Sequence, residues 1–219
     1  MEPFARLDAT AVPIGVPNLD TDQIIPARFL WRKRRDGWGD LLFHDLRFND
    51  AGAPKPEFVL NRDAYRDACV VVADRNFGCG SSREHAVWAL YDYGIRAVLA
   101  PSFGDIFFNN SFQNGLLPVV LPTERVAALR AMLEQSPGSH VAVNLEAQVV
   151  EQQVSPAVAA LAPEETRRDD LVGVDIRHAD WHRGGVKTGE GFHHGLRSWR
   201  TSVSLPATAA AAAIAGLIR

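Results

Sequence analysis

Residues 76–85 carry the side chains whose types and spacing could do chemistry, and they read Asn-Phe-Gly-Cys-Gly-Ser-Ser-Arg-Glu-His. Gly78 and Gly80 let the backbone approach a ligand closely, and Arg83 adds a planar guanidinium that matches a carboxylate or a phosphate. An ordinary tight turn with a helix cap would explain the glycines and serines alone. The charged residues that follow, Arg83 to His85, favour a site for a negatively charged ligand instead.

Two predicted elements position this stretch. Residues 69–73 form a short apolar run rich in β-branched side chains, which is typical of a buried strand. Apolar residues then recur at helical spacing over 83–93 and stop at Gly94, which indicates a helix with a glycine C-cap. The loop would therefore present its N–H groups at a helix N-terminus, where the helix dipole attracts an anion.

The rest of the chain up to residue 150 predicts alternating strands and helices. They are a strand within 4–16, a helical turn within 58–68, a strand at 95–100, a helix capped by Ser102 and running to Gln113, a strand at 116–121, a helix from Thr123, and one alternating strand over 141–150. Alternation of this kind favours a βαβ layer with parallel pairing. We expect an α/β domain with three layers in the order β/β/α.

The composition excludes several classes of function. The chain has 219 residues, enough for one good core, and its 47% hydrophobic and 22% charged residues are ordinary for a soluble globular protein. A net charge of −3 without a basic stripe argues against a nucleic-acid partner. Residues 1–16 lack a secretory signal pattern, and the apolar residues 207–218 are fewer than the roughly 20 that span a bilayer. We expect a cytoplasmic protein with no membrane contact.

The cysteines and histidines do not predict a metal site. Cys69 and Cys79 give no disulfide framework, which fits a reducing compartment, and an iron–sulfur cluster takes about four thiolates. His178 and His182 have the i, i+4 spacing of a metal pair, but no third ligand accompanies them. We expect this chain to bind neither a metal nor another cofactor by itself.

A pair of carboxylates near the N-terminus is a second candidate for chemistry. Asp20 and Asp22 bracket Thr21, and two carboxylates this close repel each other unless a cation or hydrogen-bond donors lie beside them. A turn that caps a short strand explains the pattern locally as well as a binding site does.

Three motifs in family order resemble a known group of proteins. They are residues 76–86, residues 18–26 (Asn-Leu-Asp-Thr-Asp-Gln-Ile-Ile-Pro), and residues 101–118, which begin Pro-Ser-Phe-Gly-Asp-Ile-Phe-Phe-Asn-Asn and end Gly-Leu-Leu-Pro. Together they resemble the swivelling domain of the aconitase superfamily, most closely the small subunits of bacterial 3-isopropylmalate dehydratases. The resemblance covers roughly residues 4–150 and implies an aconitase-type β/β/α swivelling domain, which we place at residues 1–155.

The resemblance implies a reversible dehydration and rehydration that interconverts 2-isopropylmalate and 3-isopropylmalate in leucine biosynthesis. A related small subunit acting on homoaconitate, methylmalate or dimethylmalate is an alternative, and so is a non-catalytic module that binds an anionic metabolite. Loss of hydroxide needs a Lewis acid. A [4Fe–4S] cluster would therefore come from a separate large subunit, and we expect that partner together with a malate-type dicarboxylate substrate.

The resemblance also implies roles for individual residues. Ser81 would be the catalytic base, and Asp22 and His85 would complete the catalytic network. The predicted substrate-binding residues are Gly80, Ser82, Arg83, Thr21, Arg28 and Arg32. The last two belong to residues 28–40, where five cationic residues and two tryptophans lie among glycines. That pattern predicts a mobile loop, which either reads the variable part of the substrate, as the resemblance implies, or is simply a solvated basic segment.

The resemblance ends at about residue 156. Residues 156–219 contain neither the closing Phe-Arg-Lys element of the family nor its Gly-Leu-Asp-Asp-Ile-Gly-Leu-Thr-Leu stretch, and they hold several histidines and an alanine tract at 209–213. We treat them as a divergent tail of uncertain fold, and a change of reading frame in the gene is one hypothesis for it.

Overall fold

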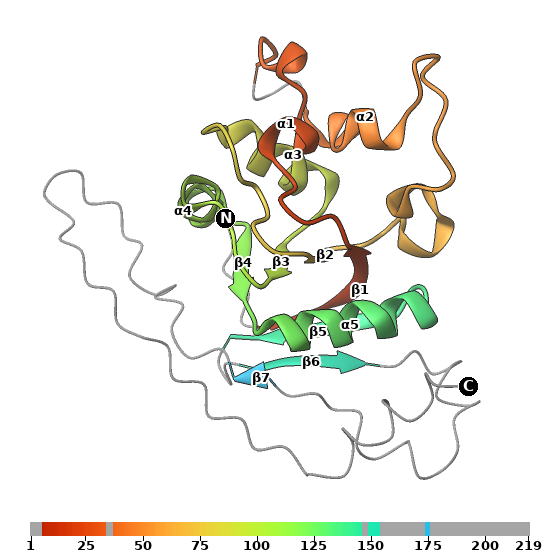
Figure 1. Ribbon diagram of the computed structural model, residues 1–219, viewed down its shortest axis with the longest axis vertical. Coiled ribbons are helices and arrows are strands. Elements are labelled where there is room, and N and C mark those ends of the chain that lie inside the picture. Colours follow the sequence, from red (N-terminus) through yellow and green to blue (C-terminus); the bar gives the residue numbers. More distant parts are fainter. Residues whose placement is uncertain (1–5, 34–36, 146–148, 154–173, 176–219) are drawn as a thin grey trace, which may run out of the picture. The chain divides into compact units, whose positions relative to one another are not determined.

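The strands of the chain form one mixed sheet (Figure 1). The computed structural model describes residues 6–33, 37–145, 149–153 and 174–175, all of which belong to one unit, Met1–Trp181. Within these residues the sheet order is β4-β3-β2-β1-β5-β6-β7. The strands are β1 (Arg6–Ile14), β2 (Val70–Ala73), β3 (Ala97–Ala100), β4 (Leu117–Val120), β5 (His140–Asn144), β6 (Val149–Gln153) and β7 (Val174–Asp175). Apart from β7, the predicted tail lies outside the described residues.

Strand β1 joins a parallel half of the sheet to an antiparallel half. Its second half, from Ala11 to Ile14, pairs in parallel with β2, and β3 and β4 continue that half. Its first half, from Arg6 to Thr10, pairs antiparallel with β5, which pairs in turn with β6. The predicted α/β class and the parallel βαβ layer are confirmed.

Three helices of nine or more residues pack on the parallel strands (Figure 1). They are α3 (Glu84–Tyr93), α4 (Asp105–Gln113) and α5 (Thr123–Gln135). Successive side chains of a strand point to opposite faces, so Val71 of β2 lies in one buried cluster with residues of α3, while Val70 and Val72 lie in a second cluster with residues of α5. Both faces of these strands are therefore covered, which explains their continuous apolar sequence.

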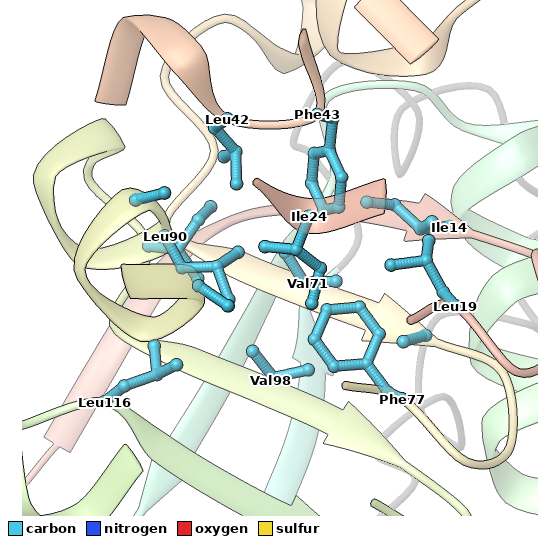
Figure 2. Close-up of a cluster of buried hydrophobic side chains, with 14 of the residues drawn as sticks. Ile14, Leu19, Ile24, Leu42, Phe43, Val71, Phe77, Leu90, Val98 and Leu116 are labelled. Carbon is cyan, nitrogen blue, oxygen red and sulfur yellow. The ribbon is translucent and has the colours of Figure 1, made fainter. Parts of the chain in front are cut away.

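Short helical segments complete the described chain. They are α1 (Thr21–Ile24), α2 (His44–Arg47), and the 3-10 turns η1 (Ala27–Phe29), η3 (Gly39–Leu41), η4 (Val59–Asn61) and η5 (Asp63–Tyr65). Figure 2 shows that side chains of these segments and of the residues between them join the cluster on the α3 face: Ile24 of α1, and Leu42 and Phe43 between η3 and α2, lie with Val71 and Leu90. Strand β2, which leads into the glycine loop, and helix α1, which follows β1, therefore pack in the same buried cluster.

Two predicted elements differ in the structure. Ser102 does not cap α4, which begins at Asp105 with Gly104 in the N-cap position; the Ser102 hydroxyl oxygen instead accepts a hydrogen bond from the Asn76 N–H at 2.8 Å. The single strand predicted over 141–150 is two antiparallel strands, β5 and β6. Apolar and polar residues alternate across the turn without a glycine or proline, so the pattern gives no sign of the break.

Candidate functional site

The glycine loop between β2 and α3 has its shape imposed by its neighbours. Gly78 and Gly80 have positive φ of 70° and 88°, a conformation that glycine adopts at little cost. A Cβ on Gly78 would lie 2.6 Å from Phe107 Cδ2, so no side chain fits there. The Gly78 N–H donates to the Leu19 carbonyl at 2.7 Å. The loop therefore lies tightly between the start of α4 and the segment after β1.

The segment 18–22 holds the serine end of this loop. Thr21 is buried, its N–H donates to the Cys79 carbonyl at 3.0 Å, and its hydroxyl donates to the Ser81 carbonyl at 2.8 Å. Asp20 is the N-cap of α1, and its carboxylate accepts from the Gln23 N–H at 2.7 Å. The capping interpretation therefore describes Asp20, although the capped element is a helix and not a strand.

Asp22 and Arg83 form an ion pair across 61 positions of sequence. The Arg83 side chain is only 14% exposed, whereas that of Asp22 is 50% exposed. Arg83 Nη1 also reaches the Ile25 carbonyl at 3.5 Å. The repulsion expected between the neighbouring carboxylates is thus relieved separately, by the Gln23 N–H at Asp20 and by a guanidinium at Asp22.

His85 lies in the first turn of α3 between two indoles. Its ring centroid is 4.8 Å from that of Trp38 and 4.6 Å from that of Trp88. Burial lowers the pKa of His85 below 6.5, an effect that nearby Glu84 opposes and Arg83 reinforces. The imidazole is therefore neutral at neutral pH and can donate from one nitrogen and accept at the other.

Ser81 and Ser82 are exposed, and Ser81 lines an open hollow of about 350 Å³. The hollow is lined by Asn76, Gly78, Cys79, Gly80, Ser81, Phe103, Gly104, Asp105 and Ile106. Ile106 is 48% exposed and adds an apolar side chain to the lining. The hollow can therefore offer the Ser81 hydroxyl to a small polar ligand, whereas Arg83 does not line it and directs its guanidinium to Asp22 and the Ile25 carbonyl.

The family is decided by comparison with known proteins. The model of the aconitase C-terminal domain matches residues 1–124. The chain belongs to that family. The resemblance drawn from the three motifs is confirmed.

Three similar proteins each carry the name 3-isopropylmalate dehydratase small subunit. The protein from Rhodospirillum centenum is 55% identical over 148 residues, which are 68% of this chain and 73% of the relative. That from Phenylobacterium zucineum is 54% identical over 177 residues, 80% of this chain and 86% of the relative. That from Gluconacetobacter diazotrophicus is 45% identical over 207 residues, 93% of this chain and 99% of the relative, so its alignment runs beyond residue 155.

A solved structure of 3-isopropylmalate dehydratase (leuD) from Methanocaldococcus jannaschii is also similar. It has 31% sequence identity and a TM-score of 0.48, and the match covers 66% of this chain and 74% of that chain.

Two predicted substrate-binding residues of this family member lie in the basic segment 28–40. The Arg28 guanidinium pairs with both carboxylate oxygens of Asp45, one at 2.8 Å, and lies over the Phe29 ring. The Arg28 hydrogen bond lowers the pKa of Asp45 to about 2. Arg32 is half-buried, and its backbone N–H donates to the Phe29 carbonyl at 3.1 Å. Residues 34–36, at the centre of the segment, lie outside the described residues, and the substrate-binding roles stay predictions.

Trp38 is the residue near the site that sequence reasoning missed. The segment was predicted to be a mobile loop, yet Trp38 is fully buried and contacts both His85 and Trp88. A tryptophan in the segment was no signal by itself, because Trp31 of the same segment is 81% exposed; only the close approach of Gly39 to α3 distinguishes Trp38.

The described residues contain neither a cluster of metal ligands nor a membrane-spanning helix. Across the described ranges, no group of three or more His, Cys, Asp and Glu could hold a metal ion, and no helix is long and apolar enough to cross a membrane. Cys69 and Cys79 are free thiols, and burial raises the pKa of Cys79. His178 and His182 lie outside the described residues.

Proposed function

We propose that the chain is the small subunit of a 3-isopropylmalate dehydratase, which interconverts 2-isopropylmalate and 3-isopropylmalate in leucine biosynthesis. The observation that carries the proposal is the meeting of two distant motifs: the Thr21 hydroxyl binds the Ser81 carbonyl and Asp22 pairs with Arg83. The family membership and the shared name of relatives that are 45–55% identical support it.

The proposed substrate is a malate-type dicarboxylate held at the serine loop. Arg83 and the loop N–H groups offer positive charge to one carboxylate, and Asp22 fixes the direction of the guanidinium. Ser81 is proposed as the base that removes the proton next to a carboxylate. A serine alkoxide forms only where cationic and N–H donors surround it, and the neutral ring of His85 completes that polar network.

A [4Fe–4S] cluster is proposed to lie in a separate large subunit. Such a cluster takes about four thiolates, and the donors of this chain do not fit it: Cys69 Sγ contacts the Asp67 carbonyl and Cys79 Sγ contacts the Asn18 carbonyl. The cluster would supply the Lewis acid for departure of the hydroxyl. The chain expressed alone should therefore contain no iron or sulfide, and stoichiometric cluster in it would overturn the two-subunit proposal.

The test is reconstitution with an anaerobically prepared large subunit of an isopropylmalate dehydratase, followed by a turnover assay. Ser81→Ala should lower kcat by about 10² to 10⁴-fold with little change in KM, because a base acts chiefly in the transition state. Ser136→Ala, at the C-cap of α5, is the matched control and should behave as wild type.

The outcomes of this assay separate the competing functions. Turnover restricted to homoaconitate, methylmalate or dimethylmalate would reassign the substrate within the same class of hydro-lyase. Substrate binding without turnover by the wild-type pair would indicate a non-catalytic anion-binding module. Near-normal kcat for Ser81→Ala would reduce Ser81 to a structural part of the loop.

A further inference from the structure

Trp38 packs its indole directly against His85. The Trp38 side chain has no exposed surface, and its ring meets the imidazole edge to face, at 62° and 4.8 Å between centroids. Trp88, one turn further along α3, covers the imidazole from another direction. Trp88 is held in turn, because its Nε1 donates to Asn114 Oδ1 at 2.9 Å. One indole next to His85 thus comes from its own helix, and the other comes from a segment 47 positions earlier in the sequence.

The backbone around Trp38 fixes where the indole lies. The Trp38 N–H donates to the carboxylate of Asp92 at 3.0 Å. The next residue, Gly39, lies so close to α3 that a Cβ would be 2.7 Å from the Tyr93 nitrogen and 2.8 Å from the Asp92 oxygen. Both contacts are to the last turn of the helix whose first turn carries His85. The indole therefore has little freedom to move relative to the imidazole.

The Trp38 side chain carries one polar atom into the buried cluster. Among the described residues, no acceptor lies within hydrogen-bond distance of the buried Trp38 Nε1. A buried donor left without a partner costs about 1–3 kcal/mol. A phenylalanine lacks this donor and still fills part of the space, which makes Trp38→Phe a conservative variant for testing the contact with His85.

We propose that Trp38 is a positioning residue for His85: its indole sets the orientation of the half-buried imidazole and shields one side of it from water. The proposal rests on the catalytic role of His85 in the proposed function. The lowered pKa of His85 agrees with it, since burial is the largest cause and the charges of Glu84 and Arg83 oppose each other. Without the indole, more of the imidazole is exposed to water and only Trp88 still packs on the ring, so its orientation is less constrained.

The first test examines the contact in the chain alone, by NMR of histidine-labelled protein with His85→Gln to assign the signal. Trp38→Leu should move the His85 ring signals and raise the pKa of His85 toward 6.5, and Trp38→Phe should have a smaller effect in the same direction. Phe43→Leu is the matched control, because Phe43 is fully buried and packs on Phe58. An unchanged His85 signal in both Trp38 variants would overturn the proposal.

The second test measures turnover of the reconstituted enzyme. Trp38→Leu should lower kcat about tenfold or more with a smaller change in KM, because orientation of a catalytic group matters most in the transition state. Trp38→Phe should be intermediate and Phe43→Leu near normal below its melting temperature. If Trp38→Leu does not fold, Trp38→Phe decides the question. That variant must still move the NMR signals of the His85 ring and lower kcat.

The two proposals fail in different ways. An active wild-type pair whose Trp38 variants keep full kcat overturns the role of Trp38 alone. An inactive wild-type pair overturns the proposed function, and the positioning role falls with it.

Discussion

The guanidinium of Arg83 supplies the positive charge of the candidate site. It is mostly buried, pairs with Asp22, and lies near the Ile25 carbonyl. A planar group that donates in several fixed directions can hold these partners and a substrate carboxylate at the same time, whereas an ammonium donates from a single point.

Arg83→Lys should therefore raise KM by about tenfold and also lower kcat, because the charge remains but the paired donors are lost. Steady-state kinetics of the reconstituted enzyme measures both. Arg130→Lys is the matched control: Arg130, 21% exposed against 14% for Arg83, pairs with Asp74 at 2.7 Å, and α5, its helix, packs on the other face of the sheet. A KM that does not respond to Arg83→Lys would place Arg83 outside the substrate site.

A second prediction concerns Asp45, the partner of Arg28. Its pKa falls to about 2 because Arg28 hydrogen-bonds to it, so the folded state binds this proton less readily than the unfolded state. The stabilisation is complete above pH 3.8 and is lost as the pH falls through 2. Because Asp45 is 57% exposed, Asp45→Asn should cost less than about 1 kcal/mol at pH 7.

Urea unfolding of wild type and Asp45→Asn between pH 7 and pH 2 tests this, because the loss falls between pH 3.8 and about 2. The difference in free energy of unfolding between wild type and Asp45→Asn should become smaller as the pH falls. A gap that is constant or widens with acid would contradict an ion pair between Arg28 and Asp45.

At the scale of elements, the glycine loop is shaped by the helix that follows the next strand. The start of α4 lies against it so closely that a Cβ on Gly104 would be 3.0 Å from the Cys79 Cα. The Gly104 N–H also donates to the Phe77 carbonyl at 2.9 Å, and Phe77 itself is buried in the core (Figure 2). The position of Ser81 thus depends on α4 as well as on its own strand and helix.

Gly78→Ala should destabilise the fold by more than about 3 kcal/mol, because the new Cβ meets Phe107 in addition to the cost of a positive φ. Gly52→Ala isolates the second cost: Gly52 has φ of 77° and nothing within 4 Å of the added Cβ. That control should lose only about 1–2 kcal/mol. Urea midpoints compare the two, and equal losses would argue against close packing of the loop on α4.

At the scale of the whole described unit, the two faces of the parallel strands contribute differently to stability and to the candidate site. The cluster on the α3 face contains Trp38, Phe77 and Phe107, which touch the glycine loop or His85. The cluster on the α5 face contains Val126, Leu129 and Leu133 and residues of the antiparallel strands. Stability draws on both clusters, whereas the candidate site contacts only the first.

Leu129→Ala tests this division. It should cost about 2–5 kcal/mol of unfolding free energy, as for other buried leucines, yet leave kcat and KM of the reconstituted enzyme within about twofold at a temperature well below melting. Thermal unfolding and kinetics on the same preparation give both quantities. A large loss of kcat in a folded Leu129→Ala protein would show that the α5 face also shapes the site.

The sequence alone determined the local parts of this protein: the buried strand, the glycine loop, and a helix ending at Gly94, whose φ of 118° is the expected C-cap. Side-chain periodicity and turn residues act over a few positions, so they can be recognised without the fold. The motifs also identified the family, because their residue types are specific.

Only the tertiary structure decided which of these parts meet. The parallel pairing of β1 with β2 brings the ends of both strands together, and with them residues 20–22 and the serine loop, about 60 positions apart in sequence. The same fold lays Trp38 on His85 and gives Arg28 a partner at Asp45. Such contacts depend on strand order and on how tightly elements pack, and neither is encoded in the spacing of residues along one segment.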